Sequence, residues 1–158
     1  MPRQAIPTWI FVYTVVRRDD RFLLVHERDG TWYLPAGRVH LGETLHAAAR
    51  RETREEAGIE IAVEGVLRIE FGPRAKGTRL RVFFTGCPLG DEEPRNEPND
   101  DTLGARFLTL QEMADLPLRS PEALSVCRAV AAGHPVQPLE VLAPEAAPWP
   151  LADDITAS

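Results

Sequence analysis

The feature that most constrains the fold is a helix expected over residues 44–57, because both of its ends are marked in the sequence. Thr44 is a typical N-cap, since its hydroxyl can accept a hydrogen bond from the free N–H groups of the first turn. Gly58 suits the left-handed conformation that commonly ends a helix. The residues between them are mostly Ala, Leu, Arg and Glu, without Gly or Pro. The segment therefore predicts one well-defined helix.

The acidic and basic residues of this helix are expected on different faces. In projection, Glu52, Glu55 and Glu56 share an arc about 100° wide, whereas the arginines lie elsewhere. Like charges this close repel and weaken a helix. Divalent cations would neutralise them, and carboxylate oxygens suit Mg²⁺ or Mn²⁺ better than zinc. Helix geometry alone leaves a second interpretation open, a charged and solvated helix face.

Segments rich in β-branched and aromatic residues predict strands before and after the helix, which indicates an α/β fold. The expected strands are 8–16, 21–27, 31–34, 60–71, 78–87 and 103–108. Residues 35–43 are expected to form a loop. Further helices are expected over 110–115 and 121–132.

The length of 158 residues suits one domain, expected over 1–133, followed by a Pro/Ala-rich tail over 134–158 that is extended or partly disordered. The net charge of −6 does not favour a broad nucleic-acid surface. Segment 91–101 alone holds six acids and one arginine. The longest apolar run is far too short to cross a membrane, and two cysteines make no disulfide framework. A cytoplasmic location is the default expectation.

The residues from Gly37 to Ile59 carry a longer pattern, Gly-x5-Glu-x7-Arg-Glu-Thr-x-Glu-Glu-x-Gly-Ile. This string resembles the signature of the Nudix hydrolase superfamily, G-x5-E-x7-R-E-U-x-E-E-x-G-U, where U is a bulky aliphatic residue. The one departure is Thr53, which stands at an aliphatic position on the face expected to pack on the sheet. Its hydroxyl can bond the carbonyl one turn back. The resemblance covers roughly residues 8–132 and leaves out the tail.

The resemblance implies a Nudix fold of MutT-like size, an α/β/α sandwich with a mixed sheet, helix 44–57 on one side and the C-terminal helix on the other. It also implies Mg²⁺ or Mn²⁺ as cofactor. The implied metal ligands are Glu52, Glu55, Glu56 and the carbonyl of Gly37. Arg51 is expected to pair with Glu43 and to orient these carboxylates.

The implied activity is divalent-metal-dependent hydrolysis of the pyrophosphate bond of a nucleoside diphosphate linked to another group. Metal ions neutralise the phosphates and activate a water, and a carboxylate takes its proton. The expected catalytic residues are Glu55, Glu56, Arg51 and, in a later loop, Asp101, whose rivals are Asp100, Glu97 and Glu93. The alternative for this loop is a solvated polar segment.

Substrate contacts are expected from Arg38, Arg79 and Arg81. The last two belong to a basic cluster with Arg68, Arg74 and Lys76, whose other interpretation is a solvated strand face. Aromatic residues such as Phe11, Tyr13 and Phe83 either stack on a base or form core.

A nucleoside triphosphate or small nucleotide derivative is the favoured substrate. The alternatives are an ADP-ribose or nucleotide-sugar pyrophosphatase and a non-catalytic module that senses nucleotides. The expected partners are a nucleotide-type small molecule and, at most, a second copy of the chain, as a monomer or homodimer. Neither a membrane nor a nucleic acid is expected as a partner.

Overall fold

The computed structural model describes residues 3–150, which form a β-rich domain with three α-helices. The strands are β1 (Thr8–Arg18), β2 (Arg21–Glu27), β3 (Trp32–Tyr33), β4 (Ala36–Arg38), β5 (Ile61–Arg74), β6 (Gly77–Pro88), β7 (Thr102–Thr109) and β8 (Gln137–Pro138). The helices are α1 (Leu45–Ala57), α2 (Leu110–Ala114), α3 (Glu122–Ala131) and the 3-10 turn η1 (Leu139–Val141).

β1 organises the sheet because it pairs along both of its edges. One edge is parallel to β6, with Val12 opposite Val82, and the other is antiparallel to β4 and, near its end, to β2. β6 pairs in turn with β5, while β2 pairs with β3 and β7, all antiparallel. The sheet is therefore mixed, as predicted.

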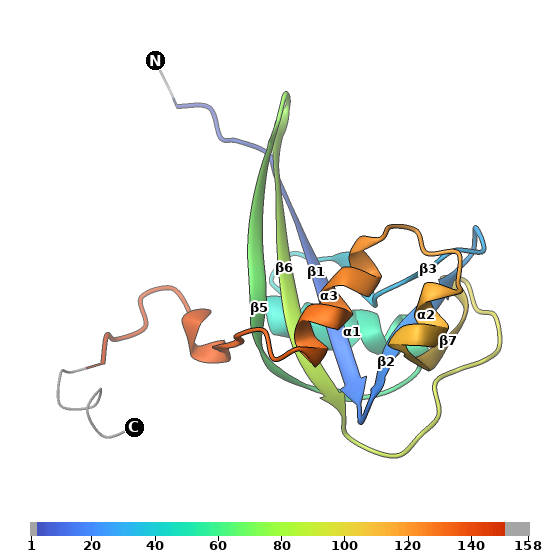
Figure 1. The fold of residues 1–158 in the computed structure, drawn as a ribbon. Helices are drawn as coiled ribbons and strands as arrows, with labels where there is room; N and C mark the ends of the chain where they lie inside the picture. The colour runs from blue at the N-terminus through green and yellow to red at the C-terminus, as the bar shows by residue number, and fades with distance from the viewer. Residues whose placement is uncertain (1–2, 151–158) are drawn as a thin grey trace.

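Successive side chains of β1 and β6 point to opposite faces of the sheet, so a hydrophobic core forms on each face. Val12 and Val82 pack with Ala48 and Ala49 of α1. Their chain neighbours, including Tyr13 and Phe83, point the other way and pack with Ala123 and Cys127 of α3. Figure 1 shows α1 and α3 on opposite faces of the sheet, which confirms the predicted α/β/α sandwich.

The ends of α1 carry the expected caps. The Thr44 hydroxyl accepts from the Ala47 N–H at 3.3 Å, and Gly58 adopts φ 73° while its N–H donates to the Arg54 carbonyl. The Thr53 side chain is fully buried, and its hydroxyl donates to the Ala49 carbonyl at 2.8 Å, as predicted.

Two segments differ from the sequence analysis. Residues 36–38, expected in a loop, form β4, because the edge of β1 supplies partners to a segment with no strand pattern of its own. After α3, β8 pairs with Gly65 and Val66 of β5, so the expected tail begins against the sheet. The end of that tail, residues 151–158, lies outside the described residues. Within 3–150, no helix combines the length and apolar character needed to cross a membrane.

Thr53→Val tests whether the buried hydroxyl is structurally needed. Valine keeps the shape, and the Ala49 carbonyl keeps its helical partner, so we expect the free energy of unfolding to stay equal or rise by up to about 1 kcal/mol. Thr44→Val makes the same chemical change at the cap and should cost about 1 kcal/mol. Urea denaturation measures both, and a loss above about 1 kcal/mol for Thr53→Val would contradict the expectation.

Candidate active site

Arg51 connects the loop before α1 to the acidic face of the helix. Its Nε and Nη2 donate to the two carboxylate oxygens of Glu43 at 2.8 and 3.0 Å, so the predicted ion pair is present. Its Nη1 donates to Glu52 at 2.7 Å and to Glu55 at 3.1 Å, and Nη2 also donates to the Arg38 carbonyl. The Arg51 side chain is only 15% exposed, and its bonds to Glu43 raise its pKa above the ordinary value. Loop and helix are thereby held as one unit.

Glu56 is the most deeply placed of the three predicted ligands. Its Oε2 accepts from the Ala36 N–H at 3.0 Å. Burial, together with the nearby carboxylates of Glu52 and Glu27, raises the pKa of Glu56 to about 8. Burial likewise raises the pKa of Glu52, against the opposing effect of Arg51. These carboxyls are held where their negative charge is costly unless a cation joins them.

Gly37 brings the main chain against this acidic cluster. The pairing of β4 with β1 places Gly37 opposite Val12. A Cβ at Gly37 would lie 2.0 Å from Cδ of Glu52, so a larger residue here would require the Glu52 carboxylate to move. Across residues 3–150, however, no three His, Cys, Asp or Glu side chains are grouped closely enough to form a metal site as they stand. Arg51 Nη1 is the cation that now bridges Glu52 and Glu55.

A cleft of about 450 Å³ opens beside Gly37. Two of the predicted substrate residues line it: Arg79 donates to the Tyr13 hydroxyl at 2.7 Å, and Arg81 lies over the Tyr13 ring at 4.5 Å. The third, Arg38, lines an adjoining hollow with Arg79 and Phe11. The structure thus brings all three arginines around one aromatic wall.

Some residues of the basic cluster fit the interpretation as substrate contacts, and others fit the interpretation as a solvated strand face. The Arg81 side chain is 20% exposed and bonded to Glu70 and Glu122, whereas the Arg68 side chain is 63% exposed. The aromatic residues divide as well. Tyr13 and Phe83 are stacked core residues, 2% exposed, and Phe11 lines the cleft.

Several cleft residues were missed by the sequence analysis because they come from the far end of the chain. Arg119 lies 3.9 Å from the Tyr33 ring centroid and donates to Glu27 at 2.6 Å. Glu122, the first residue of α3, accepts from Arg81 at 2.5 Å and from the Tyr33 hydroxyl. No local motif marks these positions, and only the packing of α3 on the sheet brings them here.

The acidic loop ends beside the last turn of α1. The Thr102 hydroxyl donates to the Glu56 carbonyl at 3.0 Å, and the Asn99 amide donates to the Glu55 carbonyl at 3.1 Å. Asp101 lies between these two anchors, with an exposed side chain. Its rival Glu93 pairs instead with Arg18 at the end of β1. Asp101 and its rival Asp100 both lie between Asn99 and Thr102, which bond to the helix that carries the glutamates.

Comparison with known proteins decides the family. A family profile described as NUDIX domain matches residues 8–128, more than half of the chain. The chain belongs to the NUDIX family. The family predicted from residues 37–59 is therefore confirmed.

Relatives of this NUDIX protein carry several names. The human 8-oxo-dGDP phosphatase NUDT18 is 36% identical over 87 residues, which are 52% of this chain and 26% of that protein. A MutT-like protein of Streptomyces ambofaciens is 45% identical over 102 residues, 64% of this chain and 63% of that one. The chain thus matches about a quarter of the length of the human relative. These names agree with the prediction of a hydrolase.

Solved structures agree with the fold. A NUDIX hydrolase from Nitrosomonas europaea superposes with a TM-score of 0.72 and 26% identity, covering 86% of this chain and 96% of that one. An ADP-ribose pyrophosphatase from Streptococcus suis superposes with a TM-score of 0.64 and 26% identity, covering 82% and 96%. The predicted Nudix fold is confirmed.

The Glu43–Arg51 pair predicts a pH-dependent stability. The bonds from Arg51 hold the pKa of Glu43 at about 2, below its ordinary value near 4.5. A lowered folded-state pKa stabilises the protein above the ordinary pKa, and this contribution is lost as the pH falls toward 2. We expect Glu43→Gln to lower the free energy of unfolding at pH 7 by about 1 kcal/mol.

Urea denaturation at pH 7, 5 and 3.5 measures this difference, which should shrink at the lowest pH. Glu93→Gln is the matched control, because its pair with Arg18 is exposed and should contribute little. A Glu43→Gln difference that stays constant over this pH range would contradict the role of the ion pair.

Proposed function

We propose that this protein hydrolyses the pyrophosphate bond of a nucleoside triphosphate or a small nucleotide derivative. One observation carries the proposal: a cleft lined by Arg79, Arg81 and Arg119 opens at Gly37, directly beside the carboxylate of Glu52. Arginines suit phosphate oxygens because their guanidinium groups donate in pairs. Arginines that can bind the phosphates thus lie next to carboxylates that can bind a cation.

The residues present fit a hard divalent cation, Mg²⁺ or Mn²⁺. The donor set is all oxygen, from Glu52, Glu55, Glu56 and the Gly37 carbonyl, which these ions prefer. The raised pKa of Glu56 reflects burial and neighbouring negative charge that a cation would offset. When bound, the metal would neutralise the phosphates and lower the pKa of an attacking water.

The chain's own residues then divide the remaining work. Arg79, Arg81 and, from the adjoining hollow, Arg38 bind phosphate oxygens and hold the chain of phosphates in line for displacement at phosphorus. Arg51 holds Glu52 and Glu55 directly and connects them to the loop through its pair with Glu43. The proton of the attacking water goes to a carboxylate, for which Glu55, Glu56 and Asp101 are the candidates.

Glu56→Gln tests the carboxylate cluster. The amide keeps the size of the side chain but neither binds a cation well nor takes a proton, so we expect kcat to fall at least about 100-fold. Mg²⁺ should also raise the thermal unfolding midpoint of the wild type more than that of the variant. Glu60→Gln, an exposed change just after α1, should leave both readouts unchanged. A fully active Glu56→Gln would remove this glutamate from the site.

The acidic loop is tested by comparing Asp101→Asn with Glu97→Gln. If Asp101 takes the water proton, only the first change lowers kcat, by about tenfold or more, and flattens the acidic limb of the pH–rate profile. Wild-type rates for both variants would exclude a base in this loop and leave Glu55 or Glu56 in that role.

The substrate is settled by a panel of nucleoside triphosphates, nucleotide sugars and ADP-ribose, read as released phosphate, pyrophosphate and monophosphate. ADP-ribose is included because the names of relatives such as the Methanocaldococcus jannaschii protein specify it. No turnover with Mg²⁺ or Mn²⁺, combined with nucleotide binding, would favour a sensing module instead. A cytoplasmic location and a monomeric or homodimeric state stay predictions.

A further inference from the structure

The last turn of α1 is capped by a segment from much later in the chain, residues 95–102. A helix ends in carbonyl groups that lack helical partners. Three of these carbonyls, at Glu55, Glu56 and Ala57, accept hydrogen bonds from this segment. Two of the same residues, Glu55 and Glu56, also carry carboxylates of the proposed cation site. The segment therefore holds the turn of the helix that presents those carboxylates.

Arg95 makes the central contacts of this cap. Its Nη2 donates to the Glu55 carbonyl, and its main-chain N–H donates to the Ala57 carbonyl at 2.8 Å. Its own carbonyl accepts from the Ala105 N–H of β7, also at 2.8 Å. One residue thus joins the end of α1 to β7. Only the bond to Glu55 depends on the side chain, because the other two are main-chain bonds.

Two glycines leave room for Arg95 beside the end of the helix. A Cβ at Gly58 would lie 3.3 Å from Cβ of Arg95, and a Cβ at Gly104 would lie 3.2 Å from the Arg95 carbonyl oxygen. Both distances are shorter than most contacts that Cβ atoms make. The two glycines also have positive φ angles, 73° and 149°. Arg95 is therefore closely packed on two sides.

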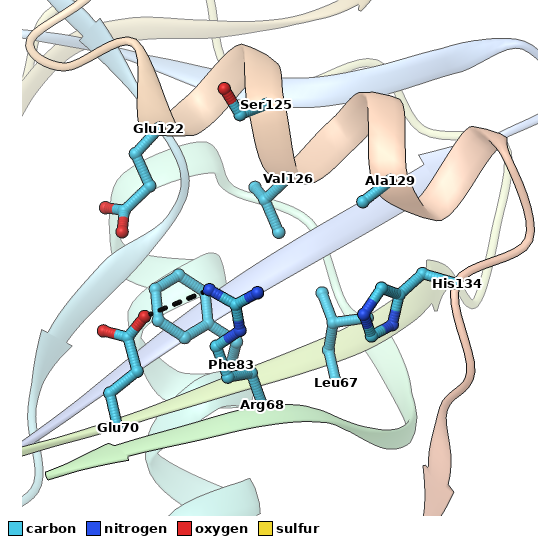
Figure 2. A pocket seen from close by; sticks show the side chains of 9 residues that line it. All are labelled: Leu67, Arg68, Glu70, Phe83, Glu122, Ser125, Val126, Ala129 and His134. Carbon is cyan, nitrogen blue, oxygen red and sulfur yellow. Dashed lines mark hydrogen bonds and ion pairs between the residues drawn. The ribbon is translucent and has the colours of Figure 1, made fainter.

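Arg95 differs from other arginines near the site in the group that its side chain binds. Arg51 and Arg81 bind carboxylates, and Arg68 pairs with Glu70 at the wall of a pocket of about 120 Å³ beneath α3 (Figure 2). Arg95 donates instead to a main-chain carbonyl at the end of α1, where the helix dipole is negative. Its positive charge thereby stabilises the helix end to which it is bonded.

We propose that Arg95 is a positioning residue, which fixes the acidic loop against the last turn of α1 and so orients the carboxylates of Glu55 and Glu56. Its effect on the reaction rests on the proposed function, which assigns these carboxylates to a cation and to the attacking water. Among the described residues, those that line the cleft do not include Arg95. It should therefore influence cation binding and kcat, and leave the binding of substrate phosphates unchanged.

Arg95→Met tests the proposal, and Arg54→Met is the matched control. Arg54 lies in the same last turn of α1, but its side chain is 60% exposed and pairs only with Glu60, at 3.5 Å, among the residues that the structure describes. Both variants remove one positive charge from the same helix end. An effect of charge alone would appear in both variants, whereas an effect of positioning would appear only in Arg95→Met.

The first measurement is calorimetry of Mn²⁺ binding to the full chain without substrate. Arg95→Met should bind Mn²⁺ about fivefold more weakly than the wild type, because the groups that orient metal ligands contribute to affinity. With a substrate, its kcat should fall about tenfold while KM changes by less than about twofold. Arg95→Lys should recover both values to within about twofold, since one bond to a carbonyl does not need the guanidinium fork. Arg54→Met should match the wild type.

Thermal unfolding checks that each variant is folded, and Arg95→Gln replaces Arg95→Met if the latter does not fold. Wild-type Mn²⁺ affinity and kcat in the folded variant would overturn the proposal. Equal losses in Arg54→Met would also overturn it, as would a loss in Arg95→Lys as large as that in Arg95→Met. No turnover by the wild type would count against the proposed hydrolysis alone, because the difference in Mn²⁺ affinity tests the positioning without it.

Discussion

The site depends on the hydrogen bonds of Arg51. One guanidinium group joins Glu43 in the loop, the carbonyl of Arg38 and the helix carboxylates of Glu52 and Glu55. A planar group with five fixed donors can hold all of these at once, whereas a lysine ammonium could not. The acids would otherwise repel one another, so this cation stabilises the helix carboxylates of Glu52 and Glu55 side by side. We propose that a divalent ion binds to this cluster.

The sheet decides what lies across from this cluster. Because β1 and β6 run parallel in strict register, alternate residues of both strands face α3, and Tyr13, Arg79 and Arg81 meet on that face. Their guanidinium groups lie over aromatic rings or bond a hydroxyl, which orders long side chains that would otherwise be mobile. Gly37 lies where this wall meets the carboxylates, so the proposed chemistry is confined to one edge of the cleft.

The sequence predicted the elements that have strong local signals. Both ends of α1, the long strands and the hydroxyl bond of Thr53 follow from residue types and spacing. β4 was missed, because three residues containing a glycine carry no pattern and form a strand only against β1. Arg119 and Glu122 were missed for a related reason, since no spacing relates them to the residues near Gly37. The pairing of Gln137 and Pro138 with β5 was not predicted, because this short segment carries no strand pattern and its close approach depends on Gly65.

By itself, the sequence determined the family, the sorted acids of α1 and the pairing of Glu43 with Arg51. These features lie within residues 37–59, where helix periodicity and a short loop leave few arrangements. Only the tertiary structure decided which arginines face the cleft, which aromatic residues are core, and that a second pocket lies beneath α3. Those outcomes depend on strand register and on packing between segments far apart in the chain, which no local pattern specifies.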